Sequence, residues 1–143
     1  MAPTDKVSRV PEGLYIKCPS CTQVIYNKDL AANLGVCPRC AHHFRMTAAE
    51  RLAMLLDGEY ATHDDGLVST DPLGFVDTKP YKSRLESSIA TTGRNDAVVT
   101  ATGLLDGIET EIAAMEYAFI GGSMGVVVGE KVTVKVIELP PVI

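Results

Sequence analysis

The sequence predicts a small zinc ribbon followed by an α/β unit, on three observations. Two C-x2-C pairs lie within 23 residues, a capped helix follows them, and a β-hairpin then runs into a glycine-rich turn. The chain has 143 residues, of which 46% are hydrophobic and 22% are charged. This size and composition suit one globular domain, or one small domain with an accessory module, and exclude a disordered chain.

The four cysteines favour a structural zinc site with the ligands Cys18, Cys21, Cys37 and Cys40. Each C-x-x-C turn directs two sulfur atoms at one centre, and the spacer between the pairs returns the chain so that they face each other. The alternatives are two disulfides, a redox pair or an iron–sulfur cluster. Disulfides need an oxidising compartment, which nothing in the sequence supports. His42 and His43 are expected to be surface residues, because four thiolates already close a tetrahedral site.

The elements of the first third follow from this site. Residues 1–13 are a polar arm, and residues 14–46 are the ribbon, with short strands expected over 14–17, 23–26 and 42–46. Such a short segment buries little apolar surface, so we expect its stability to come largely from the metal.

Two helices and a long connection are predicted next. Thr47 and Glu50 form a capping-box pattern ahead of a helix over 48–57, with Gly58 just beyond its end. The stretch 58–80 is rich in Asp, Gly and Pro and is expected to be a connection with one short strand near 60–63. A second helix is predicted over 81–92, ending at Gly93.

The last third changes to a β pattern. Residues 97–105 are β-rich, Asp106-Gly107 is a hairpin signal, and 108–120 continues as a mostly apolar strand. Because the hairpin is almost continuously apolar, we expect cover on both of its faces. Val132, Val134 and Val136 then alternate with polar residues, so residues 132–143 are expected to be a strand or an atypical tail.

The glycine turn after the hairpin comprises Gly121, Gly122, Ser123, Met124 and Gly125. It lets the backbone approach a ligand closely, and a helix beginning behind it would offer free N–H groups. The motif is neither G-x-G-x-x-G nor a P-loop, and a tight packing turn explains it equally well. No catalytic residue is assigned, because Ser123 has no recognisable partner base.

Charge and hydropathy narrow the function classes. Residues 1–51 carry seven Lys or Arg against four Asp or Glu, whereas residues 52–143 carry six against fourteen, giving net charges of +3 and −8. The total of −5 disfavours a protein that coats nucleic acid along its whole length. The sequence contains no run of 18 apolar residues, so no membrane span is predicted. Its N-terminus shows no signal-peptide pattern, and a cytosolic location is therefore expected.

Several segments together resemble the bacterial and plastid acetyl-CoA carboxylase carboxyltransferase subunit beta. The resemblance covers roughly residues 10–131. The segments that carry it are Gly13–Cys21, Asn33–Ala48 and Phe119–Lys131. Between them, the shorter matches are Lys79–Lys82, Arg84-Leu85, Thr92-Gly93 and Asp96–Val98.

The resemblance implies a fold, a reaction and partners. The fold would be an N-terminal zinc ribbon over 14–46 and the N-terminal portion of a crotonase-like (ClpP-like) α/β domain over 47–131. The reaction would move a carboxyl group from carboxybiotin, held on the biotin carboxyl carrier protein, to acetyl-CoA, forming malonyl-CoA for fatty-acid synthesis. The partners would be that carrier and the alpha subunit, in an α2β2 heterotetramer in the cytoplasm or the plastid stroma. The turn over 121–125 would contact coenzyme A, with an oxyanion hole of backbone N–H groups and no nucleophilic side chain.

The sequence departs from the family pattern after Lys131. Family members continue with a helix and a further half-domain, which carries a second Gly-Gly turn and the main acetyl-CoA oxyanion contacts. We therefore interpret the chain as a truncated or frameshifted beta subunit, or a fragment, and expect little activity from these residues alone.

A binding module without catalytic activity is the alternative function. The module would be a zinc ribbon that binds a nucleic acid or a protein. Its basic residues, which could meet a nucleic acid or the phosphates of coenzyme A, are Lys17, Lys28, Arg39, Arg45 and Arg51. Only Tyr15, Tyr26 and Phe44 could stack on bases. The same charges are also what an ordinary solvated surface carries.

Overall fold

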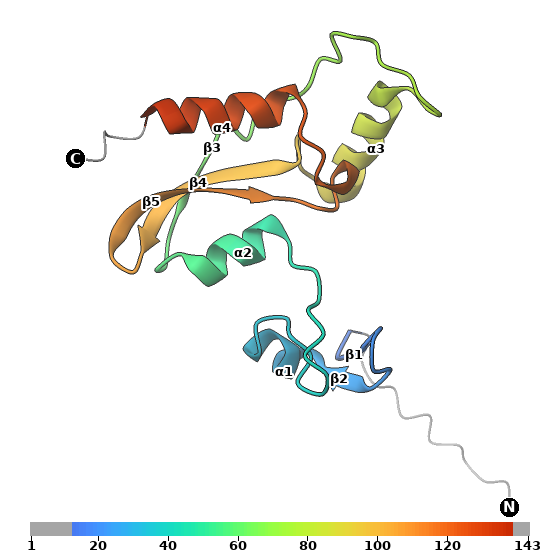
Figure 1. Cartoon of the computed structure of the whole chain (residues 1–143), viewed down its shortest axis with the longest axis vertical. Coiled ribbons are helices and arrows are strands. Elements are labelled where there is room, and N and C mark those ends of the chain that lie inside the picture. The colour runs from blue at the N-terminus through green and yellow to red at the C-terminus, as the bar shows by residue number, and fades with distance from the viewer. Residues whose placement is uncertain (1–12, 139–143) are drawn as a thin grey trace, which may run out of the picture. The chain divides into compact units, whose positions relative to one another are not determined.

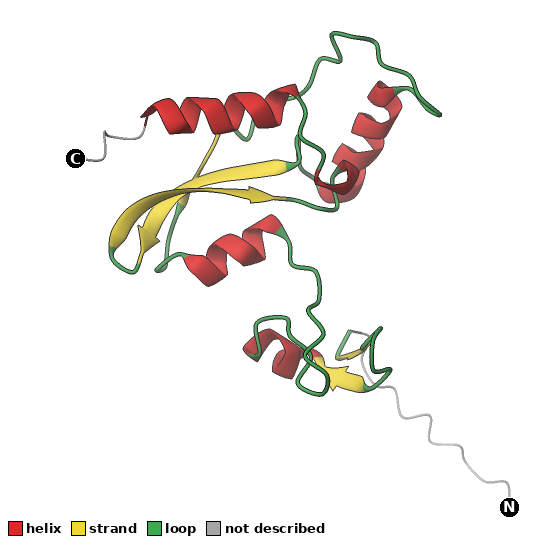
Figure 2. Cartoon of the chain, in the orientation of Figure 1, coloured by secondary structure: helices red, strands yellow, loops and turns green. Residues whose placement is uncertain are grey.

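The computed structural model describes residues 13–138, and the chain divides into two compact units at Met46 and Thr47. Each unit has its own sheet, of two strands in the first and three in the second. The expected arm over 1–13 lies almost entirely outside the described residues, and residues 139–143 of the expected tail lie outside them as well. Figure 1 colours and labels the elements in chain order, and Figure 2 distinguishes helices, strands and loops.

The first unit is a two-stranded ribbon with one short helix. Strands β1 (Tyr15–Lys17) and β2 (Val24–Tyr26) pair antiparallel, and α1 (Asn27–Ala32) follows directly. Its small core consists of Cys18, Ile25 and Cys37, with Leu30 and Phe44 packed against them. The expected strand over 42–46 is wrong, because this stretch makes only a single bridge, between Val36 and His43. Helix α1 was not expected from the sequence.

The second unit has three layers. Strands β3 (Ala61–His63), β4 (Val98–Leu105) and β5 (Ile108–Met115) form an antiparallel sheet in that order. Helix α2 (Ala48–Leu55) covers one face of the sheet and helix α4 (Val126–Glu138) the other, as Figure 1 shows. The alternation of β4 explains this, because Val99 and Ala101 belong to the cluster of α2, whereas Val98 belongs to the cluster of α4.

The predicted local signals appear at their expected positions, with one helix shorter than predicted. Thr47 and Glu50 form a complete capping box at the start of α2. That helix ends at Leu55, because Leu56 adopts an extended backbone and buries its side chain against the sheet. Helix α3 (Tyr81–Thr92) is followed directly by Gly93, its C-cap. Gly93 has the left-handed conformation that glycine adopts without strain.

The hairpin turn is formed by Asp106 and Gly107, whose φ angles are +51° and +77°. Positive φ at both central residues matches the right-handed twist of the strands. Cover on both faces is found for the first half of β4, where Val98 to Ala101 are buried, but four of the eight residues of β5 are exposed and only Ala114 is buried. The expected cover is therefore found within this chain for the first half of β4, and for β5 it stays a prediction.

The expected strand-like tail is a helix up to Glu138. Val128 and Val132 lie one helical turn apart, and both pack on the cluster of Leu85, Val98 and Phe119. Burial against the sheet therefore outweighs the β preference of the valines, because propensity is weaker than tertiary packing. Within residues 13–138, no helix is long and apolar enough to cross a membrane.

Candidate metal centre and glycine turn

The four cysteine sulfur atoms lie within 4.8 Å of one another. The Sγ atoms of Cys18 and Cys40 are 3.7 Å apart, and those of Cys21 and Cys37 are 3.8 Å apart. A tetrahedral zinc site with Zn–S bonds of about 2.3 Å requires S–S separations of about 3.8 Å. A disulfide requires about 2.05 Å, and all four thiols are free. The geometry therefore fits one tetrahedral ion and excludes two disulfides.

Two matching turns hold the sulfur atoms in place. The N–H of Thr22 donates to the carbonyl of Cys18, and the N–H of Ala41 donates to that of Cys37. Thr22 and Ala41, each four residues after the first cysteine of its pair, have φ angles of +60° and +59°. Non-glycine residues at positive φ are uncommon and cost on the order of 1 kcal/mol each, so both turns store strain that the rest of the site must offset.

The metal-free thiols differ in acidity. The backbone N–H of His42, with smaller contributions from the other three thiols, lowers the pKa of Cys40 to about 7. For Cys21, the N–H of Gln23 acts in the same direction, but burial and hydrogen bonds with the other thiols prevail and raise the pKa to about 12. A metal ion needs all four as thiolates, so binding must displace protons.

The two histidines of the ribbon do not join the sulfur cluster. Among the described residues, the group that could hold a metal consists of the four cysteines alone. The ring of His42 instead meets the edge of Phe44, with centroids 5.3 Å apart, and His43 is exposed. Their expected place at the surface therefore holds for His43, whereas His42 is half-buried.

The glycine turn has an unusual backbone. Ile120, Gly121 and Gly122 have successive φ angles of +45°, +68° and +74°, and they form the short 3-10 helix η1 (Ile120–Gly122). A Cβ at Gly121 would meet nothing within 4 Å, so conformation rather than close packing explains this glycine. A Cβ at Gly129 would also meet nothing within 4 Å, so this glycine is not required for close packing of α4 against a neighbour.

The turn positions the start of α4. The N–H groups of Gly122 and Ser123 are used within the turn, by the carbonyls of Phe119 and Ile120. The first hydrogen bond of α4 is donated by the N–H of Gly129 to the carbonyl of Gly125. The N–H groups of the residues just before Gly129 therefore lie ahead of the hydrogen bonds within the helix. Gly121, Ser123, Met124 and Gly125 are exposed, and Gly122 is half-buried.

His63 has no part in this turn. Its Nε2 lies 2.5 Å from the hydroxyl of Thr102, which donates to Glu111 on the neighbouring strand. These three side chains lie across β3, β4 and β5. A serine–histidine pair is thus not formed.

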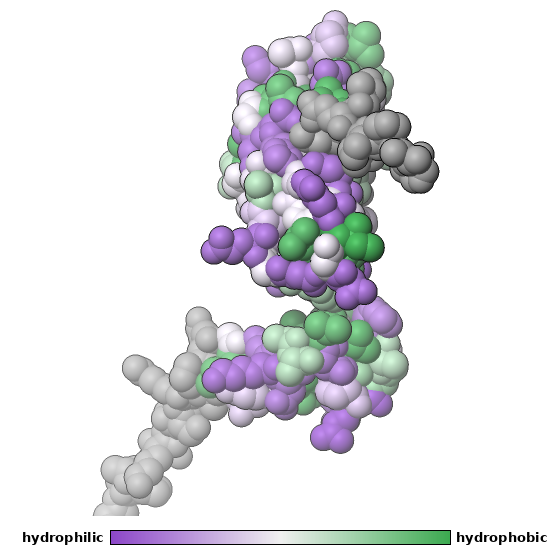
Figure 3. Space-filling view, turned by 90° about the vertical axis from the view of Figure 1, so that its left-hand side faces the viewer, coloured by the Kyte–Doolittle hydropathy of each residue, from purple (hydrophilic) through white to green (hydrophobic). Residues whose placement is uncertain are grey.

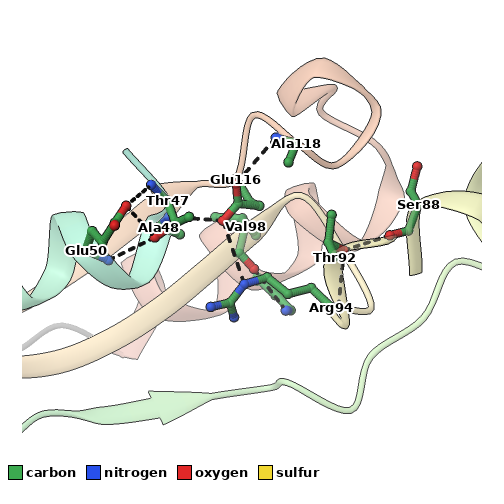
Figure 4. A network of polar contacts seen from close by, with 10 residues as sticks. Thr47, Ala48, Glu50, Ser88, Thr92, Arg94, Val98, Glu116 and Ala118 are labelled. Carbon is green, nitrogen blue, oxygen red and sulfur yellow. Dashed lines mark hydrogen bonds and ion pairs between the residues drawn. The ribbon is translucent and has the colours of Figure 1, made fainter. Parts of the chain in front are cut away.

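A buried charged residue, Glu116, lies in the segment that leads into the glycine turn. Glu116, only 5% exposed, accepts hydrogen bonds from the N–H of Ala48 at 3.1 Å and of Ala118 at 3.3 Å. Its carboxylate also pairs with Arg94 at 3.8 Å, as Figure 4 shows. It therefore joins the N-terminus of α2, the connection between α3 and β4, and the segment that leads into the turn. A negative charge at the start of α2 is also favourable to the helix dipole.

Two further buried charges flank β4. Lys131, 2% exposed, donates to the carbonyl of Val98 at 3.3 Å. Asp96 is 6% exposed, and burial raises the pKa of its carboxyl above the ordinary value, although Lys131 opposes this. Sequence reasoning did not assign these residues a role, yet a signal existed, because Glu116 and Lys131 interrupt strongly apolar runs.

Comparisons with known proteins find similarity in both units. The family model of the acetyl-CoA carboxylase zinc finger domain matches residues 15–40. Proteins named acetyl-coenzyme A carboxylase carboxyl transferase subunit beta are similar over most of the chain. The one from Citrifermentans bemidjiense is 46% identical over 126 residues, which cover 87% of this chain and 45% of that protein.

Cyanobacterial relatives of the same name give the same result. The protein of Synechococcus strain WH7803 is 48% identical over 132 residues, and that of Synechococcus strain JA-2-3B'a(2-13) is 49% identical over 135 residues. These alignments cover 90% and 92% of this chain, but 45% and 43% of the relatives. The chain thus spans less than half the length of the relatives that it matches.

Proposed function

We propose that this chain, which is homologous to acetyl-coenzyme A carboxylase carboxyl transferase subunit beta along about nine-tenths of its length, works in carboxyl transfer. The reaction takes a carboxyl group from carboxybiotin on its carrier protein to acetyl-CoA and gives malonyl-CoA. One observation carries the proposal. Identity of 46–49% extends across the ribbon and the α/β unit together, so it is not confined to the metal-binding motif.

The fold and domain assignment are part of the proposal. Residues 14–46 are the zinc ribbon, and residues 47–131 are the N-terminal portion of a crotonase-like domain. The separate tail expected over 132–143 is not proposed, because α4 runs unbroken from Val126 to Glu138. A sheet between α2 and α4 supports a layered α/β domain of this kind.

We assign Cys18, Cys21, Cys37 and Cys40 to one structural zinc ion. The S–S separations support this, and a closed four-sulfur site leaves no open position for chemistry. The zinc ion holds the two turns of the ribbon together, while its ligands hold no substrate.

The glycine turn is the proposed contact for coenzyme A. The exposed backbone of Gly121, the positive φ angles and the helix start behind the turn support it. Backbone N–H groups could hold a polarised thioester carbonyl without a nucleophilic side chain. The alpha subunit and the carrier protein are the proposed partners, because the reaction needs a biotin site as well as a thioester site.

The test uses an active complex of alpha subunit and full-length beta subunit, assayed as malonyl-CoA-dependent carboxylation of biotin. Excess of this chain should compete for the alpha subunit and lower the rate, and an alpha-subunit pull-down should retain it. A chain with no effect on the rate and no retention would contradict the proposal.

Nucleic-acid binding by the ribbon is the second candidate. Lys17 and Arg39 are exposed, and Tyr15 is 54% exposed and lies 5.4 Å from the ring of Tyr26. A gel shift with the zinc-bound chain should then weaken steeply with added salt. A shift that ignores salt, or no shift, would remove this candidate.

A further inference from the structure

The four cysteines of the metal centre differ in their access to solvent. Cys18 and Cys37 are buried, with exposed fractions of 0% and 2%, and Cys21 is half-buried. Cys40 alone among the four is exposed. Because a cysteine reacts with a dissolved reagent only where that reagent can reach it, Cys40 is the point at which the metal centre meets the solution.

Cys40 also has the chemical form that reacts. A zinc ion holds its sulfur ligands as thiolates, and the thiolate is the nucleophilic form of cysteine. The neighbours of Cys40 along the chain leave it accessible, since Arg39 and Ala41 are exposed as well. Thiolate character together with exposure is what makes a cysteine susceptible to oxidation by peroxides.

A second sulfur atom lies close enough to complete a disulfide. The Sγ atoms of Cys18 and Cys40 are 3.7 Å apart, and a disulfide needs about 2.05 Å, so they must approach by about 1.7 Å. Cys18 is shielded from solvent, so it is expected to react with an oxidised Cys40 rather than with the oxidant. An exposed cysteine beside such a resolving cysteine is the arrangement of a redox-sensitive site.

Loss of the metal would alter the fold of the ribbon. Its buried core consists of Cys18, Ile25 and Cys37, so two of the three core residues are zinc ligands. A segment with so little apolar core depends on its metal for stability. Oxidation that removes two sulfur ligands would therefore unfold the ribbon as well as release the ion.

We propose that Cys40 is a site of reversible oxidation by hydrogen peroxide, with Cys18 as its resolving partner. The thiolate of Cys40 attacks one peroxide oxygen, the O–O bond breaks, and a sulfenic acid and hydroxide form. The thiolate of Cys18 then attacks the sulfenic sulfur, a second hydroxide leaves, and a disulfide forms. Two electrons pass from the sulfur atoms to the peroxide, and the zinc ion is released. The inference rests on the proposed zinc centre and is independent of carboxyl transfer.

The test treats the zinc-bound full chain with hydrogen peroxide and follows zinc release with a colorimetric chelator, against a sample without peroxide. Free thiols are then blocked with N-ethylmaleimide, and the digested chain is mapped by mass spectrometry. We expect the Cys18–Cys40 disulfide as the first disulfide, and a sulfenic acid trapped by dimedone at Cys40. Zinc release should follow disulfide formation, and dithiothreitol with added zinc should restore the zinc-bound chain.

One variant and one control locate the reactive sulfur. Cys40→His keeps four ligands, because three cysteines and one histidine also form structural zinc sites. It should release zinc to peroxide about fivefold or more slowly than the original chain, since the exposed sulfur is gone. His43→Ala, at an exposed position outside the sulfur cluster, should release zinc at the original rate. If Cys40→His binds no zinc, the disulfide map of the original chain decides by itself.

Three results would overturn the inference. One is a first disulfide that leaves out Cys40, such as one between Cys21 and Cys37, whose sulfur atoms are 3.8 Å apart. Another is a first disulfide that joins Cys40 to a cysteine other than Cys18, and the third is zinc release from Cys40→His at the original rate.

The zinc content before oxidation separates this inference from the zinc assignment. A chain without zinc contradicts both, whereas a zinc-bound chain with a different first disulfide contradicts only the role of Cys40. The assay contains no coenzyme A, alpha subunit or biotin, so its outcome leaves the proposed carboxyl transfer untouched.

Discussion

Single residues carry the ribbon's stability, and Cys37 is the clearest case. It is 2% exposed, and its sulfur also accepts the backbone N–H of Arg39 at 3.4 Å. Cys37→Ser should abolish stoichiometric zinc and unfold residues 14–46, because the segment has almost no other core. Metal analysis and NMR signals of the ribbon measure both effects.

His43→Ala is the matched control for this change. His43 is exposed and stands outside the sulfur cluster, so its removal should leave one zinc per chain. A Cys37→Ser protein that keeps full zinc and a folded ribbon would contradict the assigned ligand set.

Glu116 is the single residue that we expect to contribute most clearly to the stability of the second unit. Glu116→Gln keeps the shape but removes the charge that faces Arg94 and the N-terminus of α2. We expect the free energy of unfolding to fall by about 1–3 kcal/mol, the cost of weakening a buried charged acceptor. Urea unfolding measures it. Glu109→Gln, at an exposed position on β5, should stay within about 0.5 kcal/mol of the original protein.

Asp96 makes the stability of the second unit depend on pH. Because burial raises its pKa, the folded state holds the proton more tightly than the unfolded chain does. Its contribution is therefore complete below the ordinary pKa of 3.8 and is lost as pH rises through the folded value. The stability of the original protein minus that of Asp96→Asn should thus decrease as pH rises.

Urea unfolding of β4, followed by its amide signals at several pH values between about 4 and 7, tests this. Glu130→Gln is the control, since it removes an exposed carboxylate from the same unit. A stability difference between the original protein and Asp96→Asn that grows with pH would contradict the assignment.

At the scale of elements, the β4–β5 hairpin depends on its turn. Gly107 has a φ of +77°, and its N–H donates to Asp57 at 2.8 Å, so the turn also meets the segment after α2. Gly107→Ala should lower the free energy of unfolding by about 1 kcal/mol or more, because alanine at positive φ is strained. Thermal and urea unfolding measure the change.

Gly66 gives the matched comparison. Its φ lies outside the positive range, and an added Cβ would meet nothing within 4 Å. Gly66→Ala should be neutral or slightly stabilising, since it restricts the unfolded chain. If Gly107→Ala and Gly66→Ala changed the free energy of unfolding equally, the positive φ of the turn would not explain the effect at Gly107.

At the scale of the whole molecule, exposed apolar side chains predict self-association. Leu73, Ile108, Met124 and Val126 of the second unit are between 68% and 86% exposed, and β5 is a free edge with few buried residues. One face of the surface is seen in Figure 3, where hydrophobic residues lie among hydrophilic ones. Such surfaces and edges favour association.

Sedimentation velocity over a range of protein concentrations measures this. We expect oligomers or low solubility for the isolated chain, and less of either when the alpha subunit proposed as its partner is present. A monodisperse monomer that unfolds cooperatively at all concentrations would show that the exposed surface needs no cover.

Most of the local structure followed from local chemistry. The capping box at Thr47, the turn at Asp106-Gly107 and the stop at Gly93 each need only a few neighbouring residues, and all three appear as predicted. Helix α1 was missed and the strand expected over 42–46 is only a single bridge, between Val36 and His43. The alternation of Val132, Val134 and Val136 was misleading, because the segment is helical and Val132 packs on the cluster of Val98 and Phe119.

The sequence by itself determined the cysteine quartet, the order of the elements from α2 to β5 and the resemblance to a carboxyl transferase subunit, because spacing and short motifs carry that information. Only the tertiary structure decided which charges are buried and what they meet. Glu116 lies beside Ala48, 68 residues away, and Asp96 lines a cavity with Phe119. Such pairings depend on how the sheet brings distant segments together, and no local pattern records them.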